Sequence, residues 1–590
     1  MLLSKRNEIE DEIMSSHHQN PGLEELRAAR RQSRGLYWTV GLFSFFVNML
    51  MLTGPLYMLQ VYDRVLGSRS EETLVALSLL VAFLYGMMGL LDYARGRIMG
   101  RVGARFQAAL DRRVFDAMIR RSAQAPDPAA QTGLQDLESV QRLVSSPVLM
   151  SAFDIPWTPL FLFGIMLFHP WLGYLAIVGG TVLIIITLFN QMFSRGPVAK
   201  AGVSTHRANL MSEEIRTEAE TIQAMGMRGA AFARWKVARD ASLGQNVQAA
   251  DVGGTFTSMT KTLRMFLQSA MLGLGAYLVL LNEVTAGGMI ASSILLGRAL
   301  APIELAIGQW ALVQRAMKGW NSLAELLTKM PEEDPRTELP QPKAKMDVQS
   351  LTVVPPGDTR AQLRTVSFRV EPGQAVGVIG PSGSGKSTLA RALTGVWRAA
   401  GGTVRLDGAA LDQYGPDVLG QHIGYLPQRV QLFEGTIAQN IARLAGMPDA
   451  EKVVAAAKKA AAHDMIVQLP DGYDTRISAG GGRLSGGQMQ RIALARALYD
   501  DPVIVILDEP NSNLDNEGSQ ALNEAIRVLK SEGKSVLIMA HRPAAIQECD
   551  MLLALDHGTV KAFGPKDQVL REVVVNHQAL QKTAAMGGVR

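Results

Sequence analysis

The 590-residue sequence contains very little cysteine and little charge. Its single cysteine, Cys549, excludes an intrachain disulfide and fits a domain that faces a reducing compartment. Only 19% of the residues are charged, 47% are hydrophobic, and the mean hydropathy of +0.10 is high for a soluble protein. These values indicate membrane spans combined with a soluble domain. The length is too great for one core, so we expect two or three domains.

The polar start of the chain, 4–34, lacks the apolar core of a cleavable signal peptide. The net charge of +5 and the pI near 9.1 could suggest a nucleic-acid partner. The basic residues, however, concentrate beside apolar runs, where they act as signals of membrane topology. We therefore expect a lipid bilayer around part of the chain and no nucleic acid.

Six apolar stretches in the N-terminal half predict membrane spans. They cover about 36–58, 73–93, 155–168, 171–193, 266–281 and 286–305. The third reaches the necessary length of roughly 20 residues only if it includes Met150 to Asp154. The sixth is expected to be interrupted by Arg298 and Pro302. Buried helices of a soluble protein are the alternative, which the apolar runs 43–52 and 172–188 make improbable for at least two of the spans.

The connections between these spans differ in length and charge. The connections at 60–72, 169–170 and 282–288 are short, and their only basic residues are Arg64 and Arg69. The connections at 94–146 and 194–261 are long, helix-like and rich in arginine. Because positive charge stays on the cytoplasmic side, this asymmetry predicts that both termini and the C-terminal half are cytoplasmic.

A glycine-rich segment follows the apolar run 375–379 and precedes a helical pattern, which is the context that separates a P-loop from a chance match. Its glycines allow backbone N–H groups to point at phosphate oxygens, and the following helix adds partial positive charge. Lys386 can reach the outer phosphates, and the Ser387 hydroxyl can ligate Mg²⁺. A glycine-rich turn without a ligand is the disfavoured alternative. The predicted nucleotide-binding residues of this segment are Gly380, Pro381, Ser382, Gly383, Ser384, Gly385, Lys386, Ser387 and Thr388.

Two acids end the apolar run 503–507, further along the same half of the chain. Asp508 fits a position that holds Mg²⁺, through water, and Glu509 fits the base that orients the attacking water. Acids at a strand end are common, but here they lie downstream of a P-loop. A proline-rich linker separates this half from the spans. We expect an N-terminal segment 1–35, a transmembrane domain 36–330, a linker 331–345, an ATPase domain 346–570 and a flexible tail 571–590.

The segment 484–488 reads Leu-Ser-Gly-Gly-Gln and opens a helix. Here the sequence resembles the ATP-binding cassette (ABC) family, whose signature these residues reproduce. The resemblance implies that Ser485, Gly486, Gly487 and Gln488 face the γ-phosphate of an ATP held by the P-loop of a second copy. The alternative is an ordinary helix N-cap. The implied fold is an all-α membrane domain of six helices fused to an α/β P-loop ATPase domain, with ATP and Mg²⁺ as cofactors.

Three further positions match the family in the expected order. Gln428 resembles the Q-loop glutamine that contacts Mg²⁺, His541 resembles the switch histidine that contacts the γ-phosphate, and Asp515 resembles the D-loop aspartate at the dimer interface. One feature of the family is lacking. The stretch 351–357 has no aromatic residue on which adenine could stack, so Val353 or Val354 would offer only an apolar contact.

Four segments narrow the resemblance to one branch of the family. They are 58–65, 153–159, 224–227 and 509–515, and they look like the inner-membrane ATPase of bacterial type I secretion systems. The branch exports proteases and other calcium-binding repeat proteins. It implies a homodimer in the inner membrane, a membrane fusion protein, an outer-membrane channel, and an unfolded polypeptide cargo with a C-terminal signal. Only about 35 residues precede the first span, too few for a folded peptidase domain.

Two other functions stay open at this stage. An exporter of lipids or small hydrophobic molecules would share every ATPase residue named above, whereas a soluble regulator is disfavoured by the spans. Asp154 raises a separate alternative, because a carboxylate near a span often lines a path or pairs with a cation. The other interpretation is that Asp154 caps a helix before Pro156.

Overall fold

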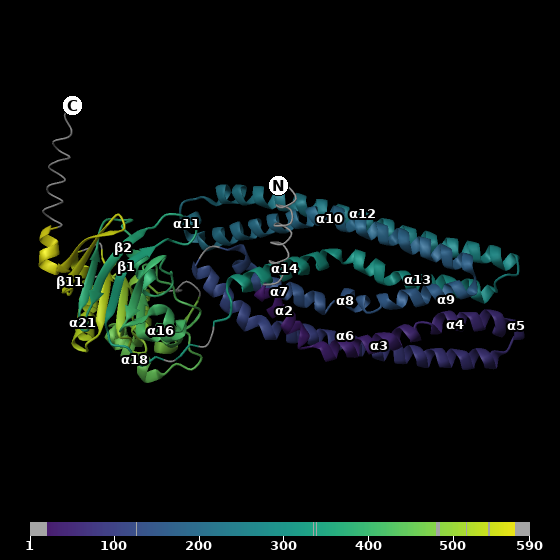
Figure 1. The fold of residues 1–590 in the computed structure, drawn as a ribbon, viewed down its shortest axis with the longest axis horizontal. Coiled ribbons are helices and arrows are strands. Elements are labelled where there is room, and N and C mark those ends of the chain that lie inside the picture. The colour runs from purple at the N-terminus through teal and green to yellow at the C-terminus, as the bar shows by residue number, and fades with distance from the viewer. Residues whose placement is uncertain are drawn as a thin grey trace, which may run out of the picture. The chain divides into compact units, whose positions relative to one another are not determined.

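The structure is a computed structural model that describes residues 20–124, 127–333, 336–337, 339–478, 484–514, 516–540 and 543–572. Asp515, His541 and nearly all of the predicted tail lie outside these residues. The chain divides into two compact units, Met1–Arg120 with Asp127–Glu332, and Arg121–Pro126 with Glu333–Arg590. Figure 1 shows long helices in the first unit and a layered α/β arrangement in the second.

The first unit is helical throughout. Its elements are α2 (Pro21–Arg31), α3 (Arg34–Leu50), α4 (Thr53–Gln60), the π-helical turn η1 (Val61–Val65), α5 (Leu66–Ser68), α6 (Glu71–Gln124), α7 (Pro128–Val144), α8 (Pro147–Ala152), η2 (Ile155–Trp157), α9 (Thr158–Phe168), α10 (Pro170–Thr217), α11 (Ala219–Ala224), α12 (Arg228–Leu280), α13 (Ala286–Gly308) and α14 (Trp310–Lys329).

Six helical segments among the described residues are long and apolar enough to cross a membrane, which confirms the predicted number of spans. They are Arg34–Ser68, Glu71–Gln124, Pro147–Phe168, Pro170–Thr217, Arg228–Leu280 and Ala286–Gly308. The third span begins before Met150, as its length requires. The expected interruption of the sixth span is wrong, because α13 continues through Arg298 and Pro302. A single proline removes one backbone hydrogen bond, which a membrane helix tolerates.

Two apolar clusters hold the first unit together. One joins α9, α10, α12 and α13 through fully buried side chains such as Ile165, Leu172, Met271 and Leu296. The other joins α2, α6, α7 and α14, and its fully buried members include Leu26, Leu137 and Leu323. The most apolar window of α6 is different, because none of it is buried within one chain.

The second unit contains three sheets. Its strands are β1 (Met346–Val353), β2 (Leu363–Val370), β3 (Ala375–Ile379), β4 (Gly401–Leu406), β5 (Ala409–Ala410), β6 (Ile423–Leu426), β7 (Gly435–Thr436), β8 (Arg476–Ile477), β9 (Ile504–Asp508), β10 (Ser535–Met539), β11 (Met551–Asp556) and β12 (Thr559–Pro565). Its helices are α15 (Lys386–Leu393), η3 (Leu411–Gln413), α16 (Pro416–His422), α17 (Ile437–Ile441), α18 (Ala450–Lys459), α19 (His463–Val467), η4 (Gly472–Asp474), α20 (Gly486–Leu498), α21 (Asn516–Ser531) and η5 (Pro543–Ile546).

The main sheet has six strands in the order β12-β11-β3-β10-β9-β6, and only β12 runs antiparallel to its neighbour. The residues of strand β9 account for its position in the middle layer. All five are buried, and all except the last, Asp508, are apolar. Val505 and Leu507 belong to one core cluster, whereas Ile504 and Ile506 belong to the other. The strand therefore packs on both faces, as expected for a parallel sheet. An antiparallel sheet in the order β2-β1-β4-β5 completes the layers.

Candidate nucleotide-binding site

The strand order brings the predicted catalytic segments to one edge of the sheet. The P-loop follows β3, Asp508 ends β9, and Gln428 lies two residues after β6. Strand β10 lies between β3 and β9 and ends at Met539, two positions before His541, which is outside the described residues. Because these strands are parallel, their carboxyl ends share this edge, which is where α/β proteins bind ligands.

The P-loop needs its glycines for their backbone angles. Gly380, Gly383 and Gly385 have φ of 156°, 79° and 100°, a region that residues with a side chain rarely adopt. Gly380 also needs its small size, since a Cβ there would lie 2.2 Å from the carbonyl oxygen of Leu555. A Cβ on Gly383 would meet nothing within 4 Å, and residues 381–383 are exposed. The tip of the loop is therefore open to a ligand.

Lys386 is the first residue of α15 and is only 5% exposed. Its Nζ donates to the carbonyl oxygens of Gly380 and Pro381, both at 2.9 Å. Burial lowers the pKa of Lys386, while the carboxylates of Glu509 and Asp508 act to raise it. The side chain thus lies folded over the loop, beside two acids, in a position from which it can neutralise added phosphate charge.

Asp508 and Ser387 have the chemistry of a Mg²⁺ site. The Ser387 hydroxyl hydrogen-bonds to the Asp508 carboxylate, and burial raises the pKa of Asp508. The Oδ1 atom of Asp508 is buried without a hydrogen-bond partner, and so is the Oγ of Ser384 in the P-loop. Buried polar atoms are normally paired, so these two oxygens fit a site that a metal ion and phosphate groups complete.

Glu509 follows directly and has a left-handed backbone, with φ of 52°. Its N–H donates to the Met539 carbonyl at 3.0 Å, which fixes the turn to β10. A residue with a side chain adopts this conformation at a cost, and such outliers concentrate at functional sites. The half-buried side chain of Glu509 thus begins a turn, 509–513, at the same edge as the P-loop.

The signature segment forms the predicted helix N-terminus. Ser485 is the N-cap of α20, and its Oγ accepts from the Gln488 N–H at 3.2 Å. The Gln488 side chain in return accepts from the Ser485 N–H at 2.9 Å, which completes a capping box. Ser485 and Gly486 are exposed. Among the described residues, no hydrogen bond or ion pair joins them to Lys386 or to the rest of the P-loop.

Gln490, which no sequence motif indicates, links α20 to the turn after Glu509. Gln490 is 2% exposed, donates through Nε2 to the Pro510 carbonyl, and accepts from the Asn513 N–H at 3.3 Å. Asn513 also lies against the signature, since a Cβ on Gly487 would be 3.0 Å from its carbonyl oxygen. Asn511 was not predicted as a site residue either, and its buried amide has no partner at either atom. Both are ordinary amides in the sequence, and only the fold gives them neighbours.

The other predicted residues have varied surroundings. Gln428 is exposed at the sheet edge. Thr388 is buried and donates to the Gln362 side chain, so its hydroxyl is occupied within the protein. Val353 is wrong as an adenine contact, because strand alternation buries it completely in the core. Val354 and the two prolines after it are partly exposed and remain as apolar contacts.

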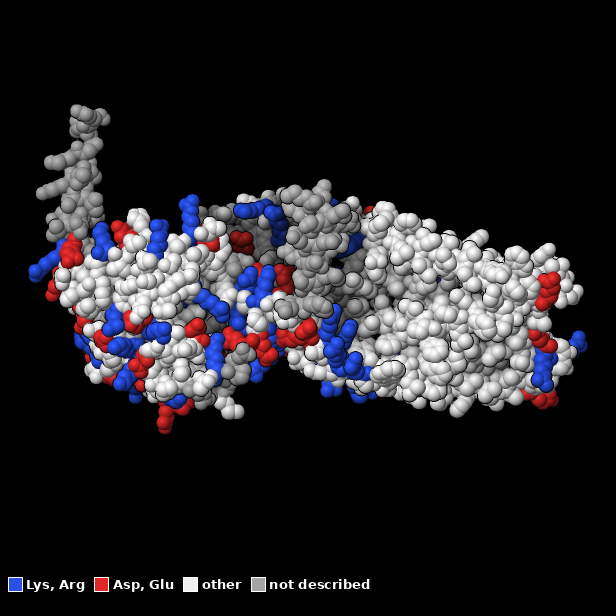
Figure 2. All heavy atoms as spheres, in the orientation of Figure 1, with Lys and Arg blue, Asp and Glu red and all other residues white. Residues whose placement is uncertain are grey.

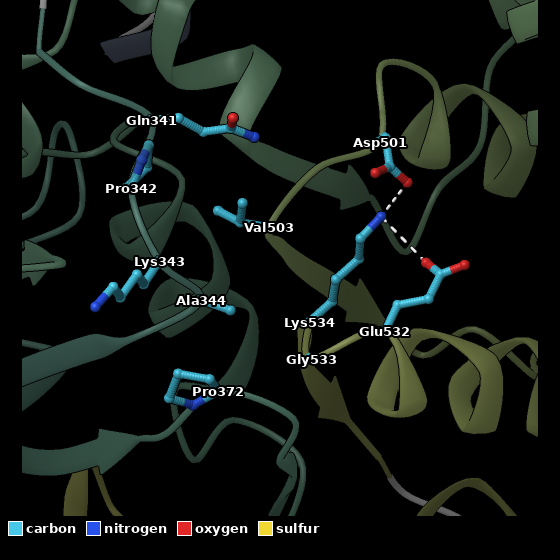
Figure 3. A pocket seen from close by; sticks show the side chains of 10 residues that line it. All are labelled: Gln341, Pro342, Lys343, Ala344, Pro372, Asp501, Val503, Glu532, Gly533 and Lys534. Atoms are coloured by element: carbon cyan, nitrogen blue, oxygen red, sulfur yellow. Dashed lines mark hydrogen bonds and ion pairs between the residues drawn. The ribbon is translucent and has the colours of Figure 1, made fainter.

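A cavity of about 340 Å³ lies elsewhere in the second unit (Figure 3). Lys534 bridges Asp501 and Glu532 on one side of it, and residues 341–344 form the other side. Asp501 precedes β9 and Lys534 precedes β10, so the cavity lies where these strands begin. It is therefore at the opposite edge of the sheet from the P-loop, and none of the predicted nucleotide-binding residues lines it.

Comparison with known proteins agrees with this arrangement. The profile of the ABC transporter transmembrane region matches residues 37–300, and the ABC transporter profile matches residues 363–512. The chain belongs to the ABC transporter family. It is an ATP-binding transporter in which an ATPase domain is coupled to six membrane spans.

Relatives and a solved structure cover nearly the whole chain. The type I secretion system ATP-binding protein PrsD of Rhizobium meliloti (strain 1021) is 45% identical over 94% of this chain and 96% of its own. The leukotoxin translocation ATP-binding protein LktB of Mannheimia haemolytica is 27% identical over 91% of this chain and 77% of its own. An ATP-dependent lipid A-core flippase of Pseudomonas fluorescens (strain Pf0-1) is 35% identical over 70% of this chain and 69% of its own. The solved structure of a bacterial Atm1-family ABC exporter with ATP bound has the same fold, with a TM-score of 0.77. It covers 94% of this chain and 98% of its own, at 23% sequence identity.

Proposed function

We propose that this protein is the ATPase and permease of a type I secretion system, which exports an unfolded polypeptide with a C-terminal signal. The observation that carries the proposal is the 45% identity to a type I secretion ATP-binding protein over almost the full length of both chains. It would work in the bacterial inner membrane with its termini and ATPase domain in the cytoplasm. A periplasmic membrane fusion protein and an outer-membrane channel would complete the path.

The active unit we propose is a homodimer. Ser485 and Gly486 are exposed at the start of α20, and no hydrogen bond or ion pair among the described residues joins them to Lys386. A second copy related by two-fold symmetry could place its signature over this P-loop and receive the same contact in return. The apolar window of α6 is not buried by any part of the chain that the structure describes, and it also needs lipid or a second copy against it.

Each P-loop would hold the phosphates of one ATP through its backbone N–H groups and Lys386. Ser387 and Asp508 would hold Mg²⁺, which neutralises phosphate charge when bound, and Gln428 would complete its surroundings. Glu509 would orient the attacking water, and His541 would contact the γ-phosphate. Asp515 and the signature of the partner would close the site. Tighter ATP binding to the closed dimer than to the open one would drive the spans to change access.

Co-purification tests this function. The full-length protein would be isolated from its native membranes with hydrolysis arrested by Glu509→Gln, and the bound proteins identified. We expect a periplasmic adaptor and a polypeptide cargo whose C-terminal segment alone competes for binding. Recovery of neither, from a variant that still binds ATP, would reject the secretion role.

An exporter of lipids or small hydrophobic molecules is the second candidate, because lipid A-core flippases are 30–35% identical to this chain. These relatives cover less of the chain than PrsD does. The two candidates differ in what stimulates ATP hydrolysis by the reconstituted protein. Stimulation by a lipid and not by a C-terminal cargo peptide would favour the second.

A further inference from the structure

The apolar stretches predicted as spans (36–58, 73–93, 150–168, 171–193, 266–281 and 286–305) contain one arginine, Arg298, and it has no partner in the part of the chain that the structure describes. Arg298 is exposed on α13, and no hydrogen bond or ion pair joins it to another described residue. It lies 12 residues after the start of α13 at Ala286 and 10 before its end at Gly308. At 1.5 Å per residue this is about 18 Å along the helix, near the middle of a hydrocarbon core of about 30 Å.

The position is unusual on this helix. Half of the apolar window of α13 is buried, and Ala299 and Leu300, the next two residues after Arg298, are 0% and 1% exposed. After the first residue of α13, its exposed positions are Arg298, Ala301 and Gly308, and their spacing places them along one narrow face. An unpaired arginine at this depth is costly in lipid and normally faces a water-filled cavity. Its face is therefore more consistent with an aqueous path than with the bilayer.

The backbone supports the same conclusion. Pro302 lies inside α13 and has no N–H, so the carbonyl of Arg298 four residues earlier lacks its usual helical donor. Such a freed carbonyl needs water or another polar group when it lies at membrane depth. Position 298 thus carries both a charged side chain and a backbone oxygen that lacks its usual helical donor.

Within these apolar stretches, each carboxylate that the structure describes is already paired. Asp92 and Asp154 both pair with Arg95 at 2.7 Å. Glu304 pairs with Arg264 at 3.2 Å. The face of the first unit drawn in Figure 2 likewise shows almost no charge between its two ends. A partner for Arg298 that breaks none of these ion pairs therefore lies outside these apolar stretches.

We propose that Arg298 is a binding point for carboxylate side chains of the transported polypeptide, halfway along an aqueous path. The proposal rests on the proposed function and adds the chemistry that the path recognises. A guanidinium binds carboxylates through two parallel hydrogen bonds, which are strong where water is scarce. Two copies of Arg298 would give a dimer two such points.

Cysteine labelling tests whether the position is in water. Cys549 is buried, and burial raises its pKa to about 12, so the natural protein offers an unreactive background. In full-length protein in membranes, we expect Arg298→Cys to react with a charged, water-soluble thiol reagent at least an order of magnitude faster than Ala299→Cys. Ala299 is the matched control because it is adjacent and buried. Reaction of Arg298→Cys only with a lipid-soluble maleimide would overturn the proposal.

Peptide binding tests the chemistry. Two fluorescent peptides of equal length, one with glutamates and one with glutamines at the same positions, would be titrated into the purified full-length protein. We expect the glutamate peptide to bind about tenfold more tightly, as one charge-assisted hydrogen bond allows. Arg298→Gln should abolish this preference and Arg298→Lys should keep most of it. Equal binding of both peptides to the natural protein, or an unchanged preference in Arg298→Gln, overturns the inference and leaves polypeptide export standing. If the protein binds an anionic lipid and neither peptide, both the inference about Arg298 and the proposed export of polypeptides are overturned.

Discussion

Arg95 donates to Asp154 at 2.7 Å and joins the second membrane span to the beginning of the third. The Arg95 side chain is 6% exposed, and it also donates to Ser44 and Asp92. Asn48 of the first span donates to the same Asp154 oxygen at 2.8 Å. The interpretation of Asp154 as a helix cap is wrong, because its side chain makes no capping hydrogen bond to η2. The carboxylate instead holds three spans together.

Removal of Asp154 should therefore destabilise the protein. Asp154→Asn would leave the Arg95 charge buried with weaker partners, and breaking a buried ion pair costs about 3–5 kcal/mol. We expect a clear fall in the thermal unfolding temperature of the purified full-length protein, with loss of ATP hydrolysis and transport together. The double variant Arg95→Met with Asp154→Leu should be milder, because the one carboxylate that loses its partner, Asp92, is largely exposed. Blocked transport with unchanged stability and hydrolysis would show instead that Asp154 contacts cargo.

Glu509→Gln should stop hydrolysis without preventing ATP binding. The amide keeps the size of the side chain but cannot accept a proton from water, and loss of a general base typically costs about 10²–10⁴-fold in rate. We expect a stable ATP-bound dimer, detected as a shift in size-exclusion chromatography with one nucleotide retained per chain.

Lys386→Ala is the matched control for this variant. It should be equally inactive, yet it should retain no nucleotide, because the side chain that neutralises phosphate charge has gone. Brisk hydrolysis by Glu509→Gln would remove the proposed role of Glu509.

Hydropathy predicted the membrane half well because a span depends on continuous apolar residues, which the sequence displays directly. The break expected in the sixth span was wrong, since a helix can absorb the loss of one hydrogen bond at Pro302. Motif spacing similarly predicted that the P-loop and Gln428 follow strands and that Asp508 lies at the end of one. The order of those strands in the sheet gave them a common edge.

Other features depend on contacts between distant parts of the chain. Nothing in the sequence marks Gln490, whose partners lie 20 and 23 residues away. The pairing of Arg95 with Asp154 spans 59 residues and follows from helix packing. Val353 was proposed for adenine only because the side of the strand it faces was unknown. Tertiary structure decides each of these cases.

Asp508→Asn should stabilise the protein in the absence of Mg²⁺. Burial raises the pKa of Asp508, which means that the ionised carboxylate is less favourable in the folded state than in the unfolded state. Its cost is fully present above the raised folded pKa and disappears as the pH falls below the unfolded pKa. We expect the variant to unfold a few degrees higher at neutral pH in the presence of a chelator. The difference should shrink in mildly acidic buffer, and a variant that unfolds earlier at neutral pH would contradict this account.

Gln490 should position the catalytic turn relative to the signature helix. Its side chain holds the Pro510 carbonyl and the Asn513 N–H, while the exposed end of the same helix carries Ser485. A change at Glu509 could thus be transmitted through Gln490 to the signature, which in the proposed homodimer would face the ATP of the partner. Gln490→Ala removes both contacts, and we expect the maximal hydrolysis rate to fall about tenfold. This fall corresponds to an increase of about 1.4 kcal/mol in the activation free energy. ATP affinity of the P-loop should change little, because Gln490 does not contact it.

Cooperativity separates this positioning role from a loss of stability. If Gln490 transmits the state of one site to the other, the Hill coefficient for ATP hydrolysis should fall toward one in Gln490→Ala. The conservative Gln490→Glu keeps an acceptor for the Asn513 N–H and should retain part of the cooperativity, although it loses the donor to Pro510. Asn523→Ala, which alters a buried amide elsewhere in the second unit, is the matched control for stability alone. An unchanged Hill coefficient in Gln490→Ala, with only the unfolding temperature lowered, would show that the contact is structural.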